Sequence, residues 1–315
     1  MYRIGIDLGA RDIVAGVVDG NNKIVGKGYA RLVGNEDANK IVEFMKQAIN
    51  NAIKISRVDM SDISLIGVAT PGSVDRKNGV VEYASNLSFE NYPLRQVLEN
   101  EYNINVFIEN DANCAALGEA IAGAGNGVDQ FVFVTIGNGI GAGIVMNGKL
   151  VRGCNDAAGE IGHMVIKLGG ERCGCGRRGC WEAYASTKAL IEQTKDAMRK
   201  NFNTLMWDMV DGDMKRVESF TAFEAIQDGD IVARTVVNQY IHYIAVGVVN
   251  VINIFQPKIL CIGGSIGTEG ESLLYPIRHY VNNEHYSINA KVQTQICAAV
   301  LGEEAALIGA SLLED

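Results

Sequence analysis

The chain has 315 residues, 28 basic and 37 acidic side chains, a net charge of −9 and 48% hydrophobic residues. This length excludes a single small module, the acidic balance disfavours a nucleic-acid surface, and Arg3 and Asp7 interrupt the apolar start of a signal peptide. We therefore predict a cytoplasmic protein of two lobes that acts on small polar molecules, with no nucleic-acid or membrane partner.

The first half of the chain alternates strands and helices. Strands are predicted at 2–8, 13–19 and 23–32, with a glycine turn at Gly9-Ala10 and a hairpin at 20–22. A helix at 37–54, a strand at 63–69, a turn at Pro71-Gly72, a helix at 93–102, a strand at 104–108 and a helix from Asp111 follow. This order predicts an α/β lobe.

The second half repeats the start of the first. Strands at 131–136 and 140–146 flank the glycine turn 137–139, and Asn147-Gly148 predicts a type I′ hairpin. A cysteine-rich loop, a helical stretch from Trp181, a helix at 230–255, a strand at 258–262 and a closing helix at 303–313 follow. The repeat predicts a duplicated β-meander plus helices in each of two lobes, with a central cleft.

The boundary between the lobes is predicted in the small-residue run 122–127. The first lobe then covers 1–122 and the second, which contains the cysteine-rich loop, covers 123–302. An alternative packs the closing segment, 303–315, on the first lobe.

Three glycine motifs suit phosphate groups, because turn glycines expose backbone N–H groups at close range. They are Gly9, the turn 137–139, and Gly263-Gly264 at the end of a strand. Each alone is equally a plain turn, but together in a duplicated framework they predict one nucleotide site. Asp7, beside the first turn, is placed to orient Mg²⁺ through water, and its alternative role is to satisfy turn amides.

The run Glu109-Asn110-Asp111 stands where a buried strand becomes a helix. Asp111 is then either a plain helix N-cap or a base that accepts the proton of an attacking hydroxyl, with Asn110 orienting that substrate. The carboxyl end of a parallel strand is the usual ligand edge of such a sheet, which favours the second interpretation.

A metal site is predicted at His163, Cys173, Cys175 and Cys180, four soft ligands within eighteen positions. Such a set suits a closed, structural, tetrahedral Zn²⁺, and the alternative is a group of ordinary buried cysteines. Glu160 and Glu182 bracket the loop, either as supports of the metal ligands or as acceptors for sugar hydroxyls. His163 keeps its second ring nitrogen for a partner.

On these motifs the sequence resembles the ROK family of sugar kinases and repressors, within the actin-like ATPase superfamily. The match rests on the zinc run 162–186, on the Glu-x-Gly-His motif that begins at Glu160, and on the segments 139–143 and 109–119. The resemblance implies two actin-like (ribonuclease H-like) lobes, often in dimers or tetramers, with Asp111 as general base. It implies sugar contacts at Gly72, Asn86, Asn110, Glu160, His163 and Glu182. The nucleotide contacts are assigned to Asp7, Gly9, Arg11, Thr135, Gly137, Gly139, Gly263 and Gly264.

The chain departs from the family in both phosphate turns. The family's Asp-x-Gly-Gly-Thr-Lys reads Asp7-Leu-Gly-Ala-Arg-Asp12 here, and Asn138 replaces a threonine. Because Arg11 can itself contact phosphate, we expect a working site.

The resulting prediction is an ATP-dependent hexose kinase of the glucokinase type, using Mg²⁺ and phosphorylating a sugar hydroxyl, with C6 of glucose as the default. N-acetylmannosamine, N-acetylglucosamine, allose and fructose stay open as substrates. A second hypothesis is a non-catalytic sugar sensor with a decayed nucleotide site. A DNA-binding repressor is disfavoured because the first predicted strand begins at Tyr2, with no helix-turn-helix before it.

Overall fold

The computed structural model describes residues 1–34, 36–84 and 87–314. The chain forms two compact units. The first comprises Met1–Phe133, Gly143–Gly159 and the segment that begins at Ala299, and the second comprises Val134–Ala142 and Glu160–Ala298. The lobes predicted at 1–122 and 123–302, and the cleft between them, stay predictions.

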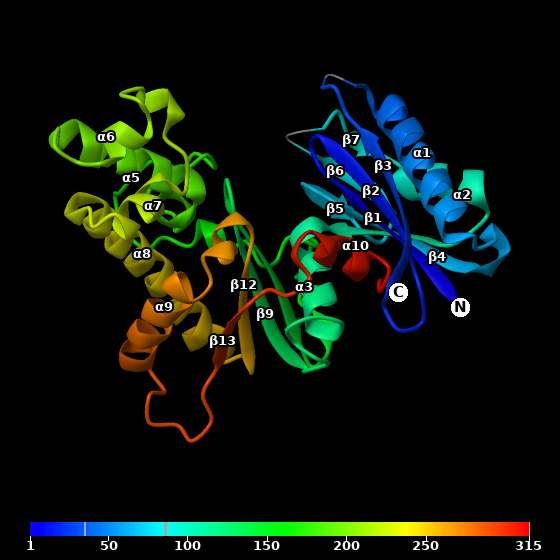
Figure 1. Cartoon of the computed structure of the whole chain (residues 1–315). Helices are drawn as coiled ribbons and strands as arrows, with labels where there is room; N and C mark the ends of the chain where they lie inside the picture. Colours follow the sequence, from blue (N-terminus) through cyan, green and yellow to red (C-terminus); the bar gives the residue numbers. More distant parts are fainter. Residues whose placement is uncertain (35, 85–86, 315) are drawn as a thin grey trace. The chain divides into compact units, whose positions relative to one another are not determined.

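The first sheet has the strand order β3-β2-β1-β4-β8 (Figure 1). β1 (Tyr2–Leu8), β2 (Asp12–Val18) and β3 (Ile24–Arg31) form an antiparallel meander, and β4 (Ile63–Thr70) and β8 (Val106–Asn110) continue the sheet in parallel from β1. The sequence located each of these strands to within two residues. The carboxyl ends of β1, β4 and β8 share one edge of the sheet.

Helices cover both faces of this sheet. Ile4 and Ile6 share a core with Met45 of α1 (Ala38–Ser56), whereas Gly5 points to the opposite face. There a Cβ on Gly5 would lie 1.9 Å from the carbonyl oxygen of Leu307, so only glycine lets α10 (Ala305–Ala310) pack this closely. The closing helix predicted at 303–313 is present but shorter, because the 3₁₀ turn η5 (Gly302–Glu304) precedes α10 and α10 ends at Ala310.

The second sheet has the strand order β11-β10-β9-β12-β13. It repeats the first sheet, with a meander of β9 (Gln130–Ile136), β10 (Ile140–Met146) and β11 (Lys149–Leu150) followed by β12 (Ile259–Gly263) and β13 (Gln295–Ala298). Asn147 and Gly148 have φ values of 54° and 73°, as a type I′ turn requires. The repeat in the sequence is therefore a repeat in topology.

The helical stretch predicted from Trp181 is interrupted at Ser186. The short α4 (Glu182–Ala185) ends there, and the Ser186 hydroxyl accepts from the Ala189 N–H at 3.1 Å to cap α5 (Thr187–Lys200). The remaining helical elements are α2 (Leu94–Tyr102), α3 (Asp111–Ile121), α6 (Met206–Met209), α7 (Thr221–Gln227), α8 (Ile231–Phe255), α9 (Glu271–Glu284), η1 (Met60–Asp62), η2 (Ile161–His163), η3 (Met214–Arg216) and η4 (Ser265–Glu269).

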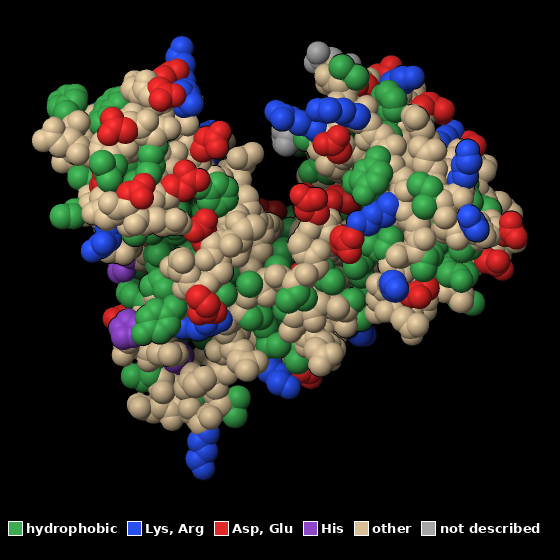
Figure 2. All heavy atoms as spheres, in the orientation of Figure 1, with side chains coloured by type: hydrophobic (Ala, Val, Ile, Leu, Met, Phe, Trp, Pro, Cys, Tyr) green, Lys and Arg blue, Asp and Glu red, His purple; other side chains and the backbone are tan. Residues whose placement is uncertain are grey.

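Among the described residues, α8 is the one helix that is long and apolar enough to cross a membrane. Its most apolar stretch is 61% buried within the protein, as in the core helix of a globular fold. Acidic and basic side chains are interspersed over the face shown in Figure 2.

Several elements carry no clear sequence signal and were not predicted. They are α9, β13 and a small antiparallel sheet of β5 (Ser73–Asp75), β6 (Val80–Tyr83) and β7 (Glu90–Tyr92). Three- and four-residue strands are too short to show a period, so their pairing partners decide them.

Candidate functional site

Asn110 links the first sheet to α3. Its side-chain oxygen accepts from the backbone N–H groups of Ala112 (2.9 Å) and Asn113 (3.3 Å), and its amide group donates to the Gly72 carbonyl at 3.3 Å. Asn110 is therefore the N-cap of α3. The alternative that Asp111 serves as a plain N-cap is wrong, because Asp111 is the first residue of the helix.

Carboxylates gather at this edge of the first unit. Asp111 accepts from the Ala112 N–H at 2.8 Å, at the helix end where a negative charge is favoured. Burial, together with the smaller effect of the negative charges of Asp111 and Glu303, raises the pKa of Asp7 to about 6. The edge therefore suits a proton or a divalent cation, which would relieve the repulsion between these groups.

Glu109, two residues before Asp111, is only 1% exposed. One of its oxygens accepts from Arg152 Nε at 2.6 Å, and the other accepts from Asn113 Nδ2 at 3.0 Å and from the Asn110 N–H at 3.1 Å. Sequence reasoning missed Arg152, because it lies 43 residues from Glu109 and has no local signal.

The four predicted metal ligands converge in the second unit. The ligand atoms of His163, Cys173, Cys175 and Cys180 all lie within 4.8 Å of one another. Cys175 Sγ and Cys180 Sγ are 3.7 Å apart, and Cys173 Sγ is 3.6 Å from His163 Nδ1. Adjacent sulfurs in a tetrahedral zinc site lie about 3.8 Å apart, given Zn–S bonds of about 2.3 Å. These residues therefore fit a Zn²⁺ ion.

The backbone of the loop shapes this cluster. Cys173 donates its N–H to the Arg177 carbonyl at 2.9 Å, and Gly176 donates to the Cys173 carbonyl at 3.0 Å. Burial raises the pKa of the Cys173 thiol to about 12, whereas a thiolate requires a nearby positive charge. A bound cation would supply that charge and tie the loop to α4, which starts two residues after Cys180.

The two carboxylates that bracket the loop differ in their surroundings. Glu160 is 67% exposed, with one oxygen 3.9 Å from His163 Nε2, the ring nitrogen that faces away from the thiols. Glu182 instead accepts from the Ile140 N–H at 3.0 Å and so ties α4 to the second glycine turn. Glu160 thus remains open to a ligand, and Glu182 supports the turn.

Two glycines near the second turn are present for different reasons. Gly264 has φ +81°, and a Cβ there would lie 2.4 Å from the Ile136 carbonyl oxygen, so the fold itself requires glycine. A Cβ on Gly137 would meet only Ser265 Oγ, at 4.0 Å. Packing does not explain Gly137, which leaves its open face for a ligand.

The first turn is closed on itself and faces solvent. Gly9 donates its N–H to the Asp12 carbonyl at 3.0 Å, and the Arg11 carbonyl accepts from Leu32 at 2.7 Å. The side chains of Ala10, Arg11 and Asp12 are exposed. An arginine and an aspartate therefore present opposite charges at the predicted first phosphate turn.

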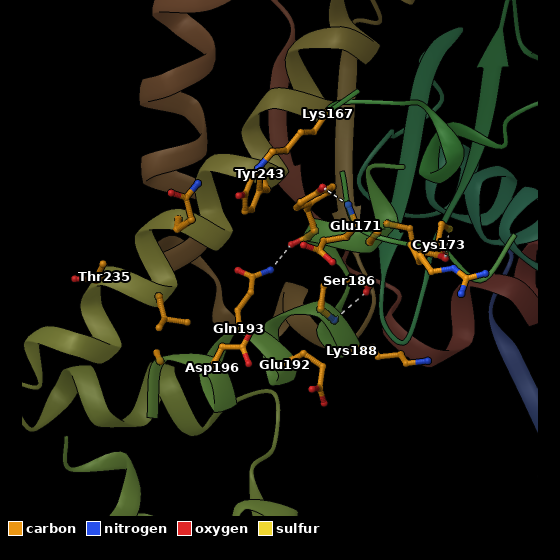
Figure 3. A pocket seen from close by; sticks show the side chains of 18 of the residues that line it. Lys167, Glu171, Cys173, Ser186, Lys188, Glu192, Gln193, Asp196, Thr235 and Tyr243 are labelled. Atoms are coloured by element: carbon orange, nitrogen blue, oxygen red, sulfur yellow. Dashed lines mark hydrogen bonds between the residues drawn. The ribbon is translucent and has the colours of Figure 1, made fainter. Parts of the chain in front are cut away.

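A pocket of about 860 Å³ opens in the second unit beside Asn138 (Figure 3). α4, α5, α8 and the metal loop line it, and they contribute Lys167, Glu171, Tyr184, Lys188, Glu192, Gln193, Asp196 and Tyr243. The volume and the mixture of basic, acidic, amide and aromatic groups suit a polar ligand the size of a nucleotide. Sequence reasoning missed this pocket because its walls come from helices far apart in the chain.

The predicted site residues are divided between the two units. The first unit holds Asp7, Gly9, Arg11, Gly72, Asn110 and Asp111, and the second holds Thr135, Gly137, Gly139, Glu160, His163, Cys173, Cys175, Cys180, Glu182, Gly263 and Gly264. Asn86, a further predicted sugar contact, lies outside the described residues.

Two sheets with one shared strand order, each a meander extended by parallel strands, define an α/β protein of the actin-like ATPase class. The sequence model of the ROK family matches residues 3–315, and the chain belongs to that family.

Its similarity to known proteins extends over almost its full length. It is 34% identical to the glucokinase of Thermotoga maritima, covering 98% of this chain and 95% of that protein. It is also 31% identical to the xylose repressor of Caldicellulosiruptor bescii, covering 90% of this chain and 70% of the repressor. A ROK family glucokinase from Streptomyces griseus, solved in complex with glucose and AMPPNP, has a TM-score of 0.82 and 32% identity, with 99% of this chain and 98% of that one covered.

Proposed function

We propose that this protein is an ATP-dependent hexose kinase of the glucokinase type. It transfers the γ-phosphoryl group of ATP to a sugar hydroxyl, with C6 of glucose as the first choice. The observation that carries the proposal is the position of Asp111, a carboxylate on the first turn of α3 whose capping role is already taken by Asn110. Similarity to a glucokinase over nearly the whole chain supports it.

In this proposal Asp111 accepts the proton of the sugar hydroxyl as that hydroxyl attacks the γ-phosphoryl group. The sugar is bound by Asn110, Gly72, Asn86, Glu160, His163 and Glu182. Asp7 would help to hold Mg²⁺, which would supply positive charge for the transferring phosphoryl group. Zn²⁺ at His163, Cys173, Cys175 and Cys180 is structural and holds the loop that carries the sugar-binding side chains.

The nucleotide is assigned to Gly9, Arg11, Thr135, Gly137, Gly139, Gly263 and Gly264. We place its base and ribose in the pocket beside Asn138, because that pocket adjoins the glycine turn whose open face suits phosphate. Lys167 and Lys188 add positive charge to the walls of this pocket.

The test measures ADP release by the purified chain with ATP and Mg²⁺ across glucose, N-acetylmannosamine, N-acetylglucosamine, allose and fructose. The proposal expects sugar-dependent release, highest with glucose. A different preferred sugar keeps the kinase assignment and changes the substrate. ATP turnover that no sugar stimulates would overturn the assignment.

A non-catalytic sugar sensor is the second candidate, and the first turn is the observation that favours it. Asp12 is exposed where the family has lysine, and one relative is a xylose repressor. If the turn has decayed, the parent binds a hexose without ATP turnover, and Ala10→Gly with Arg11→Thr creates turnover. If Arg11 instead contacts phosphate, the parent is active and Arg11→Ala weakens its use of ATP.

We further propose that the protein is cytoplasmic and forms homo-oligomers. Size-exclusion chromatography coupled to light scattering measures the oligomeric state directly.

A further inference from the structure

Glu109, two residues before the proposed catalytic base Asp111, is buried and forms an ion pair. Arg152 Nε donates to Glu109 at 2.6 Å, and the Glu109 side chain is 1% exposed whereas that of Arg152 is 22% exposed. The second Glu109 oxygen holds the backbone N–H of Asn110 and the side-chain amide of Asn113. Both oxygens are therefore occupied, and Glu109 fixes the segment that carries Asn110 and Asp111.

The charges around the start of α3 are unbalanced without the arginine. Cys114, fully buried on this helix, reports them. Burial raises the pKa of its thiol, the carboxylates of Glu109, Asp111 and Asp7 raise it further, and Arg152 lowers it. Among the described groups that shift the pKa of Cys114, three are carboxylates and Arg152 is the one cation, so the arginine offsets part of their effect on this thiol.

Arg152 also begins the segment that leads to Glu160. Its carbonyl accepts from the Ala158 N–H at 2.9 Å, and Asp156 further along accepts from the Arg76 N–H at 3.2 Å. The segment is therefore held at its first residue and in its middle. One arginine anchors both the strand end before Asp111 and the segment before Glu160.

We propose that Arg152 is a positioning residue of the transfer reaction, which holds Glu109 in place and cancels the charge of this carboxylate two residues before Asp111. This inference rests on the kinase function proposed above. An unpaired buried carboxylate two residues from Asp111 would disfavour the ionised form of Asp111, and only that form can accept the proton of the sugar hydroxyl.

The experiment compares kcat with glucose and ATP against pH for the parent and four variants: Arg152→Gln, Arg152→Lys, Glu109→Gln and the double change Arg152→Gln with Glu109→Gln. Lys46→Gln is the matched control, because it removes the same charge from surface pairs with Glu43 and Glu101 in the same unit. The KM for ATP is measured in parallel, and circular dichroism at each pH confirms folding.

Arg152→Gln should move the acid limb of the kcat profile to higher pH by roughly one unit, and Glu109→Gln, which leaves the cation alone, should move it to lower pH. The double change and Arg152→Lys should return the limb to the parent position. The control variant and the KM for ATP should stay near parent values. A purely structural role predicts that kcat falls in both single variants and does not recover in the double variant.

The inference would be overturned if the acid limb of the kcat profile does not move, or if it moves in the same direction in both single variants. Either result would leave the kinase assignment intact. A parent with no sugar-dependent turnover overturns the proposed function and the inference with it. If Arg152→Gln fails to fold, Glu109→Gln and the double variant still show in which direction the acid limb of the kcat profile moves.

Discussion

The two sheets share one strand order and carry different chemistry at corresponding edges. In the first, carboxylates stand at the strand ends: Asp7 in the last two residues of β1, Glu109 in the last two of β8, and Asp111 directly after β8. In the second, glycine turns follow β9 and β12 beside a pocket and a cluster of metal ligands. A duplicated framework thus supplies two similar edges, and substitution at a few strand ends makes one suited to proton transfer and the other to anion binding.

The two glycine turns show the same divergence in detail. The second turn is fixed on two sides, because Gly137 accepts from the first residue of α5 at 2.8 Å and Glu182 holds the Ile140 N–H. The side chains of the first turn project into solvent. It is the exposed turn that carries both Ala10 and the charged pair Arg11-Asp12, since substitutions there disturb little packing.

The largest expected effect tests the metal cluster of the second unit. The parent should contain about one zinc per chain, because its four ligands form a closed site. Cys175→Ser should lose most of that zinc together with sugar binding, as measured by metal analysis and calorimetry with glucose. Cys154→Ser, at an exposed cysteine outside the cluster, is the control and should keep both. An untreated, folded parent free of zinc would refute the assignment.

The proton-transfer role of the first unit is tested by Asp111→Asn. The amide keeps the shape of the side chain but cannot take a proton, so kcat should fall by about a hundredfold or more while glucose affinity stays nearly unchanged. Steady-state kinetics and calorimetry separate the two effects. Near-parent turnover would remove Asp111 from the reaction.

The carboxylate repulsion of the first unit is tested by pH. Because the pKa of Asp7 is raised to about 6, its protonated form stabilises the fold at low pH, and this contribution is lost as pH rises from about 4 to 6. Asp7→Asn should therefore match the parent near pH 4 and exceed it at pH 7 by up to about 3 kcal/mol, since two pKa units correspond to about that much.

Urea unfolding without ligand, at pH values from 4 to 7, measures this difference. The free energies of unfolding of the two proteins should diverge as pH rises. A constant difference between them would show that the folded chain does not disfavour the ionised form of Asp7.

The smallest effect tests the open glycine of the second unit. Gly137→Ala meets no close neighbour, so its melting temperature should stay near the parent value, whereas the KM for ATP should rise by about tenfold if phosphate approaches that face. Gly20→Ala, in a hairpin with equally open surroundings, is the control and should change neither. Parent-like ATP use in Gly137→Ala would assign Gly137 to a plain turn.

Local patterns predicted the elements with strong signals of their own. Asn147-Gly148 predicted its hairpin because few residues adopt positive φ, and the alternating strands at 2–8 and 13–19 matched β1 and β2 closely. The four metal ligands were found because they lie within one loop, where spacing alone brings them together. The three-stranded sheet of β5, β6 and β7 escaped prediction, since its strands are too short to carry a period.

The sequence by itself determined the duplicated framework, the cluster of four metal ligands and the placement of Asp111 at a strand-to-helix junction, because each depends on residues close together in the chain. Tertiary structure alone decided that Asn110 donates to the Gly72 carbonyl, that Arg152 pairs with Glu109, and that Glu182 holds the second turn. These contacts join side chains or backbone groups whose approach depends on how the strands and helices pack. Local sequence patterns carry no record of that packing.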